Sequence, residues 1–203
     1  NMSVGYNNLD VPAMARHGVL ATNAPDVLTE TTADFGFALM MAAARRVTES
    51  EHFLRAGQWK QWRYDLFAGA EVHGSTLGII GMGRIGQAVA QRARAFGVQI
   101  HYHNRKRLHS ETESQFEATY WESLDQMVAR MDILSINCPH TPSTFHLMNA
   151  RRLKLMKPSA VIINTSRGEV IDENALTRML SAGELAGAGL DVYEHGTDVN
   201  VDL

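Results

Sequence analysis

Apolar residues gather in short runs without polar alternation along this chain, separated by stretches in which they recur at helical spacing. Such runs are typical of parallel strands that are buried on both faces. They predict strands over residues 19–22, 76–80, 98–102, 133–137, 161–163 and 188–192. The helical spacing predicts helices over residues 11–16, 28–56, 84–96, 121–131, 149–156 and 173–182. Regular alternation of strand and helix predicts an α/β fold with a doubly wound parallel sheet.

The longest predicted helix, residues 28–56, is so rich in apolar side chains that much of its circumference must be covered. We expect it to pack between domains or subunits, and Gly57 to end it. An irregular segment with four large aromatic residues follows: Trp59, Trp62, Tyr64 and Phe67. We interpret these aromatics as packing or interface residues, and contact with a ligand is the alternative.

A glycine turn follows the strand at residues 76–80, with the sequence Gly81-Met82-Gly83-Arg84-Ile85-Gly86. Gly81 permits a tight turn, Gly83 allows a pyrophosphate to approach the backbone, and Gly86 allows close packing of helix on strand. The amide groups at the start of the next helix would face the bound anion. This context predicts a Rossmann-type dinucleotide-binding domain, and a glycine turn without a ligand is the alternative.

The residues after the second strand of this unit indicate which dinucleotide binds. NAD-binding domains usually carry Asp or Glu here, whereas this chain has Asn104 followed by Arg105, Lys106 and Arg107. An amide does not repel an anion, and guanidinium groups pair well with phosphate. The sequence therefore favours NADPH over NADH, with a solvated cluster of basic residues as the alternative.

Composition limits the remaining classes of function. The chain has 203 residues, 45% of them hydrophobic, and a formal net charge of −3, so no basic footprint for nucleic acid is indicated. Cys138 is the single cysteine, which excludes a disulfide within the chain and favours a reducing compartment. The sequence contains no membrane-spanning apolar stretch and no secretory signal, so we expect a cytoplasmic protein without a membrane or metal site.

Five motifs together resemble the D-isomer-specific 2-hydroxyacid dehydrogenases, most closely the NADPH-linked glyoxylate/hydroxypyruvate reductases. They run through the whole chain in the family's order: Ser3–Tyr6, Gly78–Gly86, Cys138–Thr144, Asn164–Asp172 and Leu190–Glu194. The resemblance implies reduction of a small 2-oxo acid by hydride transfer, and a homodimer. It also implies that residues 1–23 are a remnant of a flavodoxin-like substrate domain. Residues 24–203 would then form the dinucleotide-binding domain, with a long interdomain or dimer helix over 24–57.

The resemblance also assigns roles to single residues. Arg167 would be catalytic, binding the substrate carboxylate and polarising its carbonyl, with Val4 and Gly5 completing the carboxylate site. The cofactor-binding residues would be Gly81, Gly83, Arg84, Ile85, Gly86, Asn104, Arg105, Arg107, Cys138, Pro139, Thr144, Thr165, Ser166, Arg167 and Asp191. Cys138 is expected to be an inert residue of the groove wall, with a nucleophilic or redox role as the alternative.

Two expected catalytic residues are missing from their places. The family's acidic partner of the catalytic histidine falls at Gly196, and Glu194 or Asp198 would have to replace it. The histidine itself would lie beyond Leu203. The sequence therefore suggests a chain truncated at both ends. Two alternatives are a regulatory module of the same family, similar to its corepressors, and a fragment that only binds cofactor.

Overall fold

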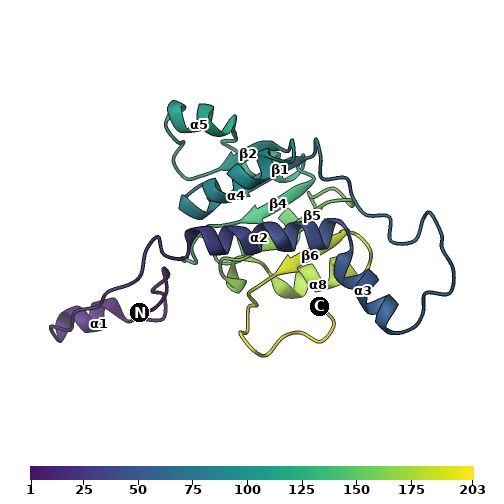
Figure 1. Cartoon of the computed structure of the whole chain (residues 1–203). Coiled ribbons are helices and arrows are strands. Elements are labelled where there is room, and N and C mark those ends of the chain that lie inside the picture. Colours follow the sequence, from purple (N-terminus) through teal and green to yellow (C-terminus); the bar gives the residue numbers. More distant parts are fainter.

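The computed structural model describes residues 1–203, and its centre is a six-stranded parallel sheet in the order β3-β2-β1-β4-β5-β6 (Figure 1). The strands are β1 Thr76–Ile80, β2 Gln99–His103, β3 Thr119–Tyr120, β4 Ile133–Ile136, β5 Val161–Asn164 and β6 Gly187–Leu190. The order runs outward in both directions from β1 and β4, which lie side by side. In such sheets, ligands bind beyond the carboxyl ends of the strands at this switch point. The predicted doubly wound fold is confirmed.

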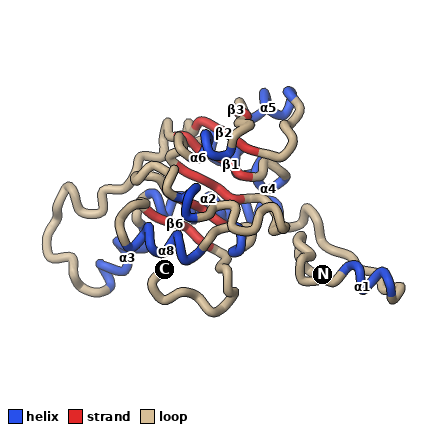
Figure 2. The backbone as a smooth tube through the Cα atoms, turned by 180° about the vertical axis from the view of Figure 1, so that it is seen from behind, coloured by secondary structure: helices blue, strands red, loops and turns tan.

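Helices cover both faces of the sheet, which is sandwiched between them (Figure 2). The helices are α1 Val11–Arg16, α2 Thr29–Ala44, α3 Val47–Arg55, α4 Arg84–Arg94, α5 Ser110–Phe116, α6 Leu124–Val128, α7 Ala150–Leu153 and α8 Glu173–Ser181, with a short 3-10 helix, η1, over Gly168–Val170. Side chains of α2 and α4 share one buried cluster with Leu77 and Ile79. Those of α6, α7 and α8 share the other with Ile80. The alternation of β1 side chains between two apolar layers explains its uninterrupted apolar sequence.

The long helix predicted over 28–56 is two helices, because the chain breaks at Arg45 and Arg46. Arg46 has a left-handed backbone, with φ 53°. The returning segment at 69–70 occupies the end of α2, where Ala70 N donates to Ala44 O at 2.8 Å. A Cβ on Gly69 would stand 2.4 Å from that same carbonyl oxygen, so the segment packs directly on the helix end. The apolar pattern did not reveal this competing hydrogen bond.

The N-terminal segment differs most from the prediction. Residues 19–22 form no strand, and the Leu20 side chain is 96% exposed, because no neighbouring strand or apolar layer meets it. Helix α1 forms as predicted and is capped by Asp10, whose carboxylate accepts from Ala13 N at 2.9 Å. Figure 1 shows this segment standing apart from the sheet.

Two short elements, α5 and β3, were missed because both are small and largely polar. They pack at the β2 edge, beside the residues expected to select the nucleotide. None of the helices is long and apolar enough to cross a membrane.

Candidate active site

The glycine turn connects β1 to α4 at the switch point of the sheet. Gly81 has φ 97°, and a Cβ there would lie 2.7 Å from Cys138 N. A Cβ on Gly86 would lie 2.4 Å from Gly81 O, so the first turn of α4 packs against the turn's own backbone. Gly83 differs from both, since its Cβ would meet nothing within 4 Å. Two glycines thus serve packing, and the third leaves open space in which an anion can approach the backbone.

Asn104 ties the glycine turn to the end of β2. Its Oδ1 accepts from Met82 N at 2.7 Å, and its own carbonyl oxygen accepts from Tyr120 Oη at 3.4 Å. The side chain is therefore a structural brace as well as a candidate ribose contact. Its amide nitrogen makes no hydrogen bond within the chain and can donate to a ribose oxygen.

The basic residues after Asn104 have unequal surroundings. Arg105 and Lys106 are exposed and form no ion pair. Arg107 instead donates twice to Glu113, from Nε at 2.9 Å and from Nη2 at 2.8 Å. The sequence predicted that Arg105 and Arg107 both pair with a 2′-phosphate. In the structure both are exposed, and only Arg105 has no carboxylate partner.

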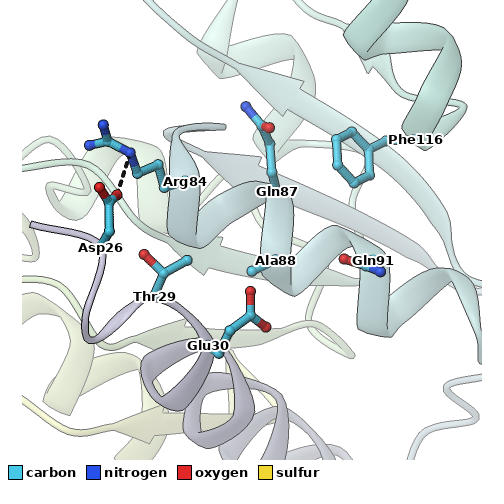
Figure 3. A pocket seen from close by; sticks show the side chains of 8 residues that line it. All are labelled: Asp26, Thr29, Glu30, Arg84, Gln87, Ala88, Gln91 and Phe116. Atoms are coloured by element: carbon cyan, nitrogen blue, oxygen red, sulfur yellow. Dashed lines mark ion pairs between the residues drawn. The ribbon is translucent and has the colours of Figure 1, made fainter.

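Arg84, the first residue of α4, points toward the start of α2 (Figure 3). Its Nε lies 2.6 Å from Asp26 Oδ1, and both side chains are well exposed. The pair borders a polar hollow between α2 and α4, which is lined by Asp26, Thr29, Glu30, Arg84, Gln87, Ala88, Gln91 and Phe116. Exposed ion pairs contribute little free energy, so Arg84 can exchange Asp26 for another anion at small cost.

Arg167 lies just beyond the carboxyl end of β5. Asn164, buried at that end, holds the loop: its Nδ2 donates to Arg167 O at 2.9 Å and its Oδ1 accepts from Ser166 N at 3.0 Å. Gly168 allows the loop to press on the chain after β6, since a Cβ there would stand 2.0 Å from Tyr193 C. The role of Asn164 was not predicted, although a polar residue ending an apolar strand is a usable signal.

The guanidinium of Arg167 rests against the N-terminal segment. Its Nε donates to Asn7 Oδ1 at 3.1 Å, and a Cβ on Gly5 would lie 1.9 Å from its Nη2. None of the ion pairs in the structure involves Arg167. The structure thus brings Arg167 and Gly5 together across more than 160 residues. Its Nη1 donates to Ser166 O at 2.7 Å. A guanidinium without a carboxylate partner can bind a substrate carboxylate through charge-assisted hydrogen bonds.

The other predicted residues lie around the same edge of the sheet. Thr165 lies beside α2, since a Cβ on Gly36 would stand 3.6 Å from its side chain. Asp191 N donates to Asn164 O at 3.0 Å, and the residue is exposed. Thr144 closes its own loop, with its Oγ1 donating to Pro139 O at 2.7 Å. Val4 and Ile85 are half-buried.

Of the two replacements considered for the acid at Gly196, Glu194 is already engaged. Its Oε1 lies 2.6 Å from His146 Nε2, and its Oε2 accepts from Glu173 N at 3.3 Å. Asp198 is exposed and forms no ion pair. The structure therefore leaves Asp198 as the carboxylate that remains available.

Cys138 follows β4 and is buried beside the glycine turn. Burial raises the pKa of its thiol to about 11, so the nucleophilic thiolate is scarce at neutral pH. We expect the folded chain to react with a disulfide reagent at pH 8 about a hundredfold more slowly than free cysteine does. Unfolding in denaturant is the control and should restore the normal rate. Rapid modification of the folded chain would contradict the inert role.

Comparison with known proteins decides the family. Residues 37–200 match the D-isomer specific 2-hydroxyacid dehydrogenase NAD-binding domain. The chain belongs to this family. It is 45% identical over 207 residues to the glyoxylate reductase of Thermococcus gammatolerans, covering 100% of this chain and 61% of that protein. The chain thus spans less than two thirds of that relative's length.

Similar solved structures share this fold. A glyoxylate/hydroxypyruvate reductase from Sinorhizobium meliloti, described as NADPH-dependent and in complex with NADP and malonate, is 39% identical, with a TM-score of 0.86. The alignment covers 99% of this chain and 61% of that one. A D-lactate dehydrogenase from Aquifex aeolicus, in complex with NAD and lactic acid, is 32% identical, with a TM-score of 0.84, covering 95% and 56%. Because these two similar proteins were solved with different nucleotides, the cofactor must be argued from the residues of this chain.

Proposed function

We propose that the protein containing this chain reduces a small 2-oxo acid, glyoxylate or hydroxypyruvate, with NADPH. The observation that carries the proposal is the unpaired guanidinium of Arg167, held against Gly5 at the edge of the sheet where the glycine turn also lies. Residues 1–23 would then contribute an edge of the substrate domain, and residues 24–203 would form the cofactor domain.

The glycine turn fits the pyrophosphate of a dinucleotide. The open space at Gly83 and the free amide groups at the start of α4 supply a cradle with a favourable dipole. Arg84 would turn from Asp26 to the pyrophosphate. Bound NADPH would supply the hydride that reduces C2 of the substrate.

This chain's own residues would bind and orient the substrate. Arg167 would bind the carboxylate of the 2-oxo acid and stabilise the negative charge that develops on its carbonyl oxygen. The backbone of Val4 and Gly5 would complete the carboxylate site. Asn164 would keep the backbone of Arg167 in place through its hydrogen bond to the arginine carbonyl. The proton would come from the histidine that the family places beyond Leu203.

Activity can be tested with protein expressed from the complete reading frame that contains this chain. We expect NADPH to be consumed when glyoxylate or hydroxypyruvate is added. The loss of absorbance of the reduced nicotinamide measures this reaction. Binding of cofactor without turnover of any small 2-oxo acid would refute the proposal and support the regulatory alternative. The unpaired state of Arg167 favours the enzyme over that alternative.

Selectivity for NADPH is proposed to depend on Arg105. Replacing Arg105 with alanine should raise the dissociation constant for NADPH about tenfold or more, because a charge-assisted hydrogen bond to the 2′-phosphate is lost. NADH binding should change less than about twofold. Fluorescence titration with each nucleotide measures both values. Lys106→Ala is the matched control, since it removes a neighbouring charge without removing a guanidinium.

A stronger affinity of the wild-type chain for NADH than for NADPH would contradict the proposed cofactor. An equal loss of affinity for NADPH and NADH in the Arg105→Ala variant would also contradict it.

We also propose a homodimer built on the projecting α3 and the segment after it. Trp59, Trp62 and Tyr64 are all more than half exposed there, which is unusual for large aromatic side chains.

A further inference from the structure

A hydrogen-bond cluster with two buried members, Tyr102 and Glu113, lies beside the loop that is proposed to bind the 2′-phosphate. Glu113, in α5, accepts from both Nε and Nη2 of Arg107. It also accepts from Tyr102 Oη at 2.5 Å. Tyr102 Oη in turn accepts from Leu108 N at 3.0 Å. Three residues thus join the end of β2, the loop after it and the start of α5.

The charge states within this cluster are well defined. Hydrogen bonds from Arg107 and then Tyr102 lower the pKa of Glu113 to about 2. Burial, together with the hydrogen bond to Glu113, raises the pKa of Tyr102 to about 12. At neutral pH, Glu113 is therefore an ionised acceptor and Tyr102 a neutral donor. Only 11% of the Glu113 side chain is exposed, whereas 65% of that of Arg107 is.

The cluster fixes one end of the loop, and Asn104 fixes the other. Asn104 is held by Met82 N and by Tyr120 Oη. The guanidinium of Arg107 also lies over the Tyr120 ring, 5.6 Å from its centroid. Between these anchors, Arg105 and Lys106 face solvent. The loop is thus a short span that is held at both ends and presents one unpaired guanidinium.

We propose that Glu113 is a positioning residue for nucleotide selectivity, which acts by holding Arg107 as a fixed support so that Arg105 is presented to the 2′-phosphate. This inference rests on the proposed NADPH-linked function. Pre-ordering the loop removes an entropic cost from binding. It also means that Arg107 serves the loop and is not itself a phosphate ligand.

The variant Glu113→Gln separates this role from simple electrostatics. It makes the loop more positive by one charge, which by attraction alone would strengthen binding of the 2′-phosphate. It also removes the charge and one of the two oxygen acceptors that hold Arg107, so at most one neutral hydrogen bond remains. We expect the dissociation constant for NADPH to rise about fivefold to tenfold despite the added charge, with less than about twofold change for NADH.

A double-mutant cycle tests whether Glu113 acts through Arg105. In the Arg105→Ala background, Glu113→Gln should leave the ratio of NADPH to NADH affinity unchanged. Tyr102→Phe is a second variant that keeps the buried ring while removing the hydroxyl group from Glu113 and Leu108 N. It should shift the ratio in the same direction as Glu113→Gln, and NADH binding reports that each variant is folded.

Three outcomes would overturn the inference. Tighter NADPH binding in Glu113→Gln would mean that Glu113 restrains Arg107 from binding the phosphate. An equal loss of affinity for NADPH and NADH would mean that Glu113 has a general structural role. If Glu113→Gln changed the affinity ratio as much in the Arg105→Ala background as in the wild type, Glu113 would act by another route. The ratio of NADPH to NADH affinity in the wild-type chain tests the proposed cofactor. The change of this ratio between variants tests the role of Glu113, so the two proposals can fail separately.

Discussion

Replacing Arg167 with alanine should lower kcat/KM for glyoxylate or hydroxypyruvate by at least about 100-fold, which is the scale expected when a donor to developing negative charge is lost. The guanidinium has no carboxylate partner in the structure, so its removal leaves no buried charge unpaired. The loss should therefore appear in turnover and substrate binding, while thermal stability stays close to that of the wild type. Steady-state kinetics of the protein from the complete reading frame would measure it.

Arg178→Ala is the matched control, because Arg178 is an exposed arginine of α8 that forms no ion pair. It should retain full activity. Arg167→Lys keeps the charge and loses the planar fork, so it should fall between wild type and alanine. Wild-type turnover in Arg167→Ala would remove this residue from the catalytic role.

Alanine at two positions of the glycine turn should separate cofactor binding from folding. Gly83→Ala adds a methyl group to open space, so stability should be unchanged, while both nucleotides bind about tenfold more weakly because the cradle is filled. Gly86→Ala places the methyl group against Gly81 O, and overpacking of this kind costs about 1–3 kcal/mol. Denaturant unfolding and nucleotide titration measure the two effects.

The pair of variants provides its own control, since each changes one glycine of the same turn to the same residue. Gly83→Ala should weaken NADH and NADPH alike, in contrast to the selective effect expected at Arg105. If Gly83→Ala binds both nucleotides as tightly as wild type does, the pyrophosphate does not lie at this turn.

The sheet could be predicted from the sequence because its strands are buried on both faces. Their apolar runs, such as residues 161–163, carry a signal that does not depend on distant neighbours. The residues at 19–22 carry a similar pattern and form no strand, since pairing needs a partner that a local pattern does not reveal. The break at Arg46 escaped prediction for a related reason: the competing donor, Ala70 N, is far along the chain.

The candidate site, like the fold, could be predicted only in part from the sequence. The residues brought together at the sheet edge, including Arg167 and Gly5, could be located from motifs. What could not be predicted is which charged groups are already paired. Arg107 and Glu194 have the residue types expected for their predicted roles. In the structure, however, Arg107 is hydrogen-bonded to Glu113, and Glu194 to His146. Motifs show which types of side chain are present, whereas the pairing of charged side chains depends on how distant elements pack together.

The brace between Asn104 and the glycine turn bears on how nucleotide preference could change during evolution. Met82 N needs only an oxygen acceptor at 104, and the Oδ1 of asparagine provides it. Aspartate would offer an oxygen in the same place, and it is the residue type that usually binds the ribose hydroxyls in NAD-dependent domains. A single base change in the codon would therefore alter the charge facing the ribose while keeping the turn braced. If this chain prefers NADPH as proposed, a single substitution at residue 104 would move that preference toward NADH.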